Sequence, residues 1–151
     1  MRRLTVQTPT GDVTLTEEGD AITRVEWGGR GGHDHSTVLD RAAQQLAAYF
    51  EDSTNKFDLP LKVEGSAFQQ AVCDAMRAIP VGHTLTYGDI ARDLSVPPQA
   101  VGQACGGNPI PIIIPCHRVL GATSLGGFSG AGGVETKVTL LRHEGAAGLL
   151  I

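Results

Sequence analysis

The sequence has few cysteines, no long apolar run and no recognisable leader. Its three cysteines, at positions 73, 105 and 116, are an odd number and cannot form a complete disulfide framework. The longest apolar stretch, 110–115, is far too short to cross a bilayer. The basic pair Arg2-Arg3 is followed by no apolar run of signal-peptide length. These absences argue against secreted and membrane proteins and predict a cytoplasmic protein with free thiols.

Positive charge is also scarce. Residues 1–64 contain seven Lys or Arg against eleven Asp or Glu, so they carry the whole net charge of −4. Residues 65–151 contain five of each kind and are neutral. Because phosphate neutralisation needs local Lys and Arg, the charge balance alone does not favour a nucleic-acid partner.

The first 64 residues predict a small sheet followed by a helix. Alternating apolar residues indicate three strands, around Leu4 and Val6, Val13 and Leu15, and Ile22, Val25 and Trp27. Apolar spacing over 39–50 predicts a helix with Phe50 on its buried face. Residues 56–63 are expected to be extended, with Pro60 arguing against a central strand.

We expect a second domain over 65–151 that is mainly helical. Ser66 is typical of an N-cap, and the helix that it starts is expected to end before Pro80. A glycine-rich loop over 121–133 precedes a last helix over 134–143. The whole chain is therefore predicted to be α/β, of the α+β type, with a small sheet-plus-helix lobe packed on this helical domain.

Two short helices are expected in the middle of the second domain. One starts near Tyr87, and the other, 99–106, ends in a Gly-Gly pair that is typical of a C-cap. The tight break Val96-Pro97-Pro98 joins them, and the pair resembles a helix-turn-helix in a winged-helix-like domain.

The sharpest chemical feature is the tetrapeptide Pro115-Cys116-His117-Arg118. A thiol is a poor nucleophile until it ionises, and a nearby base or positive charge lowers its pKa. His117 and Arg118 offer both. Taken by itself, the tetrapeptide is equally consistent with an inert buried thiol, because free cysteine is common in protein cores.

Further motifs flank this tetrapeptide in a fixed order. They are Gly65-Ser66-Ala67-Phe68-Gln69, Ile79-Pro80-Val81-Gly82 with Thr86-Tyr87, Ala100-Val101-Gly102, Asn108-Pro109, Gly126-Gly127-Phe128-Ser129-Gly130, and Lys137 through to Gly145. Together with Pro-Cys-His-Arg, this set resembles the O6-alkylguanine-DNA alkyltransferases. The resemblance covers residues 65–145 almost without gaps and extends more loosely over residues 1–64.

The resemblance implies DNA repair by direct reversal. Cys116 would accept the alkyl group of O6-alkylguanine, and possibly of O4-alkylthymine, in one irreversible transfer, so that each molecule acts once. His117 would act through a water as the base, and Glu144 would orient His117. Asn108 would hold the active-site turn, and Tyr87 would donate a hydrogen bond toward the base.

The resemblance also implies which residues contact the substrate and the DNA. The guanine would be bound by Ser129 and the backbone around Val119, with Phe128 and Arg118 beside them. The helix that enters the minor groove would present Gln99, Ala100, Gly102 and Gln103. No cofactor is implied. The expected partner is double-stranded DNA containing O6-alkylguanine. The protein is expected to be a monomer and not to bind membranes.

The chain departs from the family pattern at the DNA-binding helix. Gln99 occupies the position at which the family has an arginine that fills the space left by an extruded base. Across residues 84–108 the sole basic residue is Arg92, which lies between Asp89 and Asp93. We therefore expect weak DNA binding with a shallow salt dependence. Phe128 replaces a common tyrosine, a change that we expect to be tolerated.

The chain also contains an HxH pair, His33 and His35, which could ligate a metal. A structural zinc site needs four ligands, and residues 1–64 contain no cysteine, so we reject a metal site. Cys73 and Cys105 are interpreted as small packing residues.

Three alternatives to DNA repair stay open at this point. The chain could bind alkylated DNA without repairing it, although relatives of that kind lack the acceptor cysteine. It could scavenge alkyl groups from free bases or small molecules, which the uncharged Gln99 and the acidic balance favour. It could also be a structural protein with an inert thiol.

Overall fold

The computed structural model describes residues 1–29, 31–128, 130 and 132–146. The chain divides into two compact units, Met1–Glu64 and Gly65–Ile151. The first unit consists of a sheet with one helix, and the second is mainly helical. This arrangement confirms the predicted α+β class.

The first unit is built on a three-stranded antiparallel sheet. Its strands are β1 (Arg2–Thr8), β2 (Gly11–Glu18) and β3 (Ala21–Trp27), in the order β1-β2-β3. Val13 and Leu15 of β2 are fully buried, as predicted, but Thr14 and Thr16 on the opposite face are buried as well, so β2 is not the half-buried strand that its alternation indicates. The three strands expected from the sequence are therefore confirmed.

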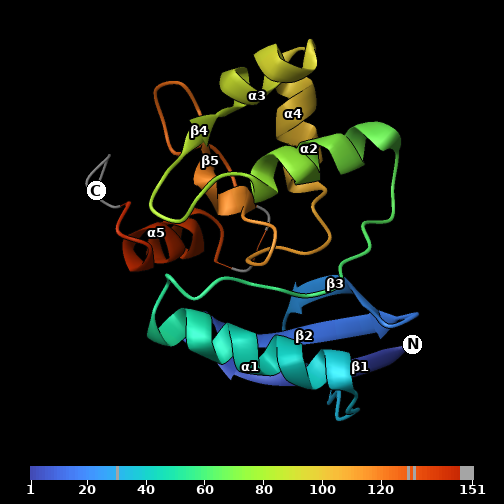
Figure 1. Cartoon of the computed structure of the whole chain (residues 1–151). Helices are drawn as coiled ribbons and strands as arrows, with labels where there is room; N and C mark the ends of the chain where they lie inside the picture. The colour runs from blue at the N-terminus through green and yellow to red at the C-terminus, as the bar shows by residue number, and fades with distance from the viewer. Residues whose placement is uncertain (30, 129, 131, 147–151) are drawn as a thin grey trace. The chain divides into compact units, whose positions relative to one another are not determined.

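Helix α1 (Thr37–Glu51) packs on strands β1 and β2 (Figure 1). The Ser36 side chain caps it by accepting a hydrogen bond from the backbone N–H of Leu39 at 3.0 Å. Its buried aromatic is Tyr49, 1% exposed, and not the predicted Phe50. The apolar face continues from Leu46 by a step of three residues, so Tyr49 points inward.

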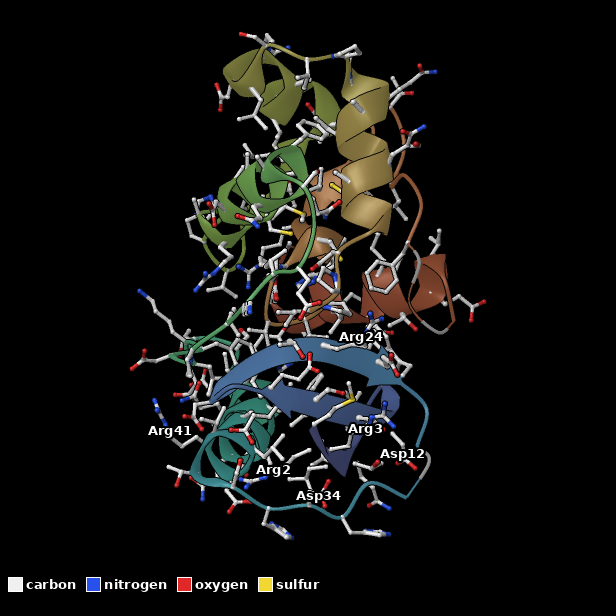
Figure 2. All side chains as sticks on the ribbon, turned by 90° about the vertical axis from the view of Figure 1, so that its right-hand side faces the viewer. Arg2, Arg3, Asp12, Arg24, Asp34 and Arg41 are labelled. Atoms are coloured by element: carbon white, nitrogen blue, oxygen red, sulfur yellow. The ribbon has the colours of Figure 1, made fainter. Side chains whose placement is uncertain are left out.

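Two connections complete the first unit. The backbone N–H of Arg3 donates to the carboxylate of Asp34 at 2.9 Å, which ties the loop after β3 to β1; both residues are labelled in Figure 2. The predicted extended segment runs beside Ile22 of β3, whose N–H donates to the Pro60 carbonyl at 2.8 Å and whose carbonyl accepts from Lys62 at 3.0 Å. Pro60 contributes an acceptor, so its missing N–H is not needed.

The described part of the second unit is mostly helical (Figure 1). Its helices are α2 (Ala67–Arg77), α3 (Tyr87–Leu94), α4 (Pro98–Gly106) and α5 (Val134–His143). Ser66 caps α2 as predicted, and Thr86 forms a capping box with Asp89 at the start of α3. Within the described residues, no helix is both long and apolar enough to span a membrane.

Two very short strands lie beside the helix pair α3–α4. Strands β4 (Leu85–Thr86) and β5 (Val119–Leu120) pair in parallel, with Leu85 opposite Val119. A 3₁₀ turn, η1 (Cys116–Arg118), leads directly into β5. This pairing brings the start of α3 next to the tetrapeptide, although about thirty residues separate the two segments in the sequence.

Candidate active site

The segment that leads to Cys116 is a tight turn closed by one side chain. Asn108 is buried, and its amide nitrogen donates to the carbonyl of Ile114 at 2.9 Å. Its amide oxygen accepts from the N–H of Ile110 at 3.0 Å. Between these two bonds, Ile112 has a φ of 71°, a left-handed conformation that a β-branched residue rarely adopts. Asn108 therefore clamps both ends of a strained turn that leads to Cys116.

Cys116 begins η1 and faces a pocket of about 480 Å³. The residues that line this pocket are Tyr87, Gly102, Cys105, Gly106, Cys116, Gly127 and Phe128. An added Cβ at Gly102, Gly106 or Gly127 would meet no atom within 4 Å, so the absence of side chains keeps this pocket open. Cys116 therefore borders an open space on the surface of the second unit.

His117 is fully buried and bound to a carboxylate. Its Nε2 lies 2.7 Å from Oε2 of Glu144, the residue that follows α5. Because a carboxylate only accepts hydrogen bonds, the proton is assigned to Nε2, which leaves Nδ1 as an acceptor. Nδ1 is buried and has no hydrogen-bond partner among the described residues. His117 is thus oriented as a neutral base with one open nitrogen.

Glu144 also holds the guanidinium of Arg118. Arg118 Nε and Nη2 donate to the two carboxylate oxygens at 2.8 and 3.0 Å, and Nη1 donates to the Ile79 carbonyl at 2.6 Å. The sequence predicts substrate contact for Arg118. In the structure all of these donors serve Glu144 and Ile79, so the arginine fixes the carboxylate that orients His117.

Burial dominates the protonation of both central residues. Burial raises the pKa of the Cys116 thiol, while a hydrogen bond from Asn108 and the charge of Lys137 act to lower it. Burial lowers the pKa of His117 against the opposing effect of Glu144, and the charges of Arg118 and Lys137 lower it further. Before substrate binds, the pair is therefore a neutral thiol beside a neutral imidazole.

Tyr87 and Val119 are two further residues that the sequence assigns to the site. Tyr87 lines the pocket, and burial raises the pKa of its hydroxyl, so the group is a hydrogen-bond donor at neutral pH. Val119 is buried on β5, and its carbonyl accepts from Nζ of Lys137 at 2.6 Å. Phe128 lines the same pocket. Ser129, the remaining predicted guanine contact, lies outside the described residues.

Comparison with models of protein families identifies the family of the chain. A family model described as "6-O-methylguanine DNA methyltransferase, DNA binding domain" matches residues 67–146. A second model, the ribonuclease-like domain of the same methyltransferase, matches residues 1–63. The chain belongs to the 6-O-methylguanine DNA methyltransferase family.

Relatives in the family resemble the chain over nearly its whole length. The constitutive methylated-DNA–protein-cysteine methyltransferase of Bacillus subtilis is 40% identical over 154 residues, covering 93% of this chain and 93% of that protein. A structure of Mycobacterium tuberculosis OGT in complex with DNA is 38% identical with a TM-score of 0.85, covering 97% of this chain and 94% of that one. A Methanococcus jannaschii O6-methylguanine DNA methyltransferase is 31% identical with a TM-score of 0.68, covering 94% and 93%.

The helix that the family resemblance assigns to DNA has an uncharged outer face. Gln99, Gln103 and Gly106 of α4 are exposed, whereas Val101 and Ala104 face the core. Ala100 and Gly102 are half-buried. The predicted DNA-binding residues therefore lie along one accessible helix, and no ion pair involves any of them.

The remaining candidates are His35 and two further cysteines, of which Cys105 lines the same pocket as Cys116. His35 Nδ1 contacts Asp40 Oδ1 at 2.8 Å in the first unit, and the part of the chain that the structure describes contains no cluster of three or more His, Cys, Asp or Glu able to hold a metal. Cys73 and Cys105 are both buried, and the Cys105 thiol contacts Met76 sulfur at 3.6 Å.

Sequence reasoning gave no role to Lys137, a fully buried residue of α5. A signal was available: Lys137 lies three and four residues before Leu140 and Leu141, on the buried face of the helix. A lysine at a core position is rare unless it is paired or functional.

Proposed function

We propose that this chain repairs O6-alkylguanine in DNA by transferring the alkyl group irreversibly to Cys116. The observation that carries the proposal is the buried His117–Glu144 pair, at 2.7 Å, next to a thiol that opens on a pocket. This is the nucleophile, base and orienting group of covalent catalysis. Family membership supplies the substrate class.

The transfer balances without a cofactor. The Cys116 thiol proton passes through a water to Nδ1 of His117, and Glu144 stabilises the imidazolium. The thiolate sulfur attacks the alkyl carbon, so an S–C bond forms as the C–O6 bond breaks. The electron pair stays on the guanine, which takes up one proton in place of the alkyl group. The thioether resists hydrolysis, so the protein acts once.

The walls of the pocket position the base. The Tyr87 hydroxyl donates to the guanine and stabilises the charge that develops on it as the alkyl group leaves. The backbone around Val119, together with Ser129, binds the guanine edge, and Phe128 provides an apolar wall. Arg118 acts indirectly, by holding Glu144 in place.

DNA binding falls to residues 65–151, through the helix pair α3–α4. In this assignment α4 enters the minor groove, and Gln99 fills the stack after base extrusion. Ala100 and Gly102 allow close approach of the helix, and Gln103 extends the same face. One monomer serves one lesion.

A scavenger of free alkylated bases is the second candidate. The uncharged outer face of α4 favours it, because phosphate binding then relies on backbone amides. A module that binds alkylated DNA without repair is disfavoured, because such a module would not need a cysteine at position 116, in the lining of the pocket.

The deciding experiment measures the intact mass of the reduced protein, with peptide mapping, after incubation with a duplex containing one O6-methylguanine. A parallel sample receives the free methylated base at equal concentration. We expect one methyl group on Cys116, added much faster from the duplex. Cys116→Ser is the matched control and should gain no mass.

Two results would contradict repair. Faster transfer from the free base would make the protein a scavenger. An unchanged mass in both samples, with binding to the methylated duplex retained, would make it a binding module.

A further inference from the structure

Lys137 is an ammonium in the core without a carboxylate partner. It is fully buried, whereas the two other lysines of the chain, Lys56 and Lys62, are exposed. No ion pair among the described residues includes Lys137. Burying a charge without an opposite charge is expensive, so a lysine at this position calls for an explanation.

The ammonium contacts two segments that line the pocket, at Gly127 and Tyr87, and a third that follows Cys116, at Val119. Nζ donates to the Val119 carbonyl at 2.6 Å and to the Gly127 carbonyl at 3.1 Å. It also lies 5.9 Å from the centre of the Tyr87 ring, within the range of a cation–π contact. Val119 follows η1, Gly127 belongs to the glycine-rich loop, and Tyr87 starts α3.

The electrostatics of the site identify the missing negative charge. Burial lowers the pKa of Lys137 to about 8, and the thiols of Cys116 and Cys105 act in the opposite direction. Burial raises the pKa of Cys105 to about 12, so Cys105 stays neutral at physiological pH. Cys116 is therefore the group that can become the counter-charge of Lys137, once its proton is removed.

We propose that Lys137 is a positioning residue for alkyl transfer, which fixes the carbonyls of Val119 and Gly127 around the base and electrostatically favours the Cys116 thiolate. The inference rests on the proposed function and names a further residue of the same site. The ammonium compensates the cost of forming an anion in a buried position, and its charge is fixed before the substrate arrives.

Several other groups around the site titrate or carry charge. They are Cys73 on α2, Tyr87 on α3, Cys105 on α4, His117 and Arg118 in η1, and Glu144 after α5. Because Lys137 also lowers the pKa of His117, its charge must act more strongly on the sulfur than on the imidazole for the proposal to hold. The test therefore measures the thiol directly.

The first experiment compares Lys137→Met, a neutral side chain of similar length, with Lys137→Arg and with Lys56→Met, the same substitution at an exposed lysine. The rate at which iodoacetamide alkylates Cys116 is followed from pH 6 to pH 10 without DNA, and peptide mapping separates the three cysteines. We expect Lys137→Met to react about tenfold more slowly at pH 7, with its profile displaced to higher pH. Lys137→Arg and Lys56→Met should retain the wild-type profile.

The same variants are then reacted with the O6-methylguanine duplex. We expect Lys137→Met to transfer about tenfold more slowly, with unchanged affinity for undamaged duplex. Slower transfer with an unchanged iodoacetamide profile would overturn the charge role and leave a structural one. If the wild type transfers no methyl group, the proposed repair fails, while the iodoacetamide profile still decides the role of Lys137.

A second measurement does not require the Lys137 variants to fold. Three lysines give three ¹³Cε signals in a labelled wild-type protein, and the spectra of Lys56→Met and Lys62→Met identify the third, that of Lys137. The Lys137 signal should titrate near pH 8, and Cys116→Ser should lower its pKa further, because interactions between sites are reciprocal. A third signal unaffected by Cys116→Ser would overturn the coupling.

Discussion

Oε2 of Glu144 lies 2.7 Å from Nε2 of His117, and the same carboxylate holds the guanidinium of Arg118 through two hydrogen bonds. One buried carboxylate thus serves an imidazole and a guanidinium that are adjacent in the chain. Its negative charge is needed twice: to orient the base and to compensate the partly buried Arg118.

Glu144→Gln removes this charge while keeping the size of the side chain. We expect methyl transfer to slow by about 100-fold, since the imidazolium loses its stabilising partner. We also expect the free energy of unfolding to fall by about 3 kcal/mol, because Arg118 is left without a counter-charge. Stopped-flow transfer assays and urea unfolding measure the two effects.

Glu135→Gln is the matched control, because Glu135 is exposed in the first turn of α5. It should change the free energy of unfolding by less than about 0.5 kcal/mol and leave transfer unaffected. Equal losses in the two variants would show that the charge of Glu144 has no special role.

Asn108→Ala tests the clamp on the turn over 108–114. It leaves the buried N–H of Ile110 and the carbonyl of Ile114 without this partner, and we expect the free energy of unfolding to fall by about 2–4 kcal/mol. Asn55→Ala, which removes an exposed bond to the Ala48 carbonyl, should cost about 1 kcal/mol or less. Urea unfolding compares them, and similar losses would argue against a clamp.

Stability should depend on pH through Lys137. Its pKa is about 8 when folded against 10.5 ordinarily, so between these values the unfolded chain binds more protons than the folded one. The free energy of unfolding of the wild type relative to Lys137→Met should therefore be constant below pH 7 and rise from pH 8 to pH 10.5. Urea unfolding under reducing conditions measures the difference, and a decrease over this window would contradict the lowered pKa.

Gln99→Arg should restore a positive charge to the outer face of α4. With one more phosphate neutralised, the slope of log affinity against log salt should become steeper by about 0.9. Gln7→Arg adds the same charge to β1, and it should leave the slope unchanged. Fluorescence anisotropy with an undamaged duplex measures both, and equal slopes would place the DNA contact elsewhere.

The first unit could be predicted closely because its strands and helix follow simple periodicities. The error at Tyr49 and Phe50 arose because steps of three and of four residues both fit a helical face, and only packing decides between them. Strands β4 and β5 were missed, since two residues carry no measurable alternation. Their pairing depends on a contact between Leu85 and Val119 that no local pattern contains.

The residues of the candidate site were found through the resemblance, because Cys116 and His117 are adjacent in a distinctive motif. The structure adds what spacing cannot supply, namely the contact between His117 and Glu144, 27 residues apart. Arg118 was placed at the substrate because its own partners are distant in the sequence. Lys137 was interpreted only as part of a helix motif, although its spacing from Leu140 and Leu141 places it on the buried face of α5.

The helix pair α3–α4, which would meet DNA, is bounded by two residues of the candidate site. Tyr87 is the first residue of α3, and Asn108 follows the end of α4 by two residues. At most one residue separates the helices from Tyr87 and Asn108. A shift of the helix pair would therefore displace the Tyr87 side chain or the turn that Asn108 clamps. DNA binding and alkylation of Cys116 would then be thermodynamically linked. Bound DNA would change the ease of alkylation of the sulfur, and alkylation would change the affinity for DNA by the same factor.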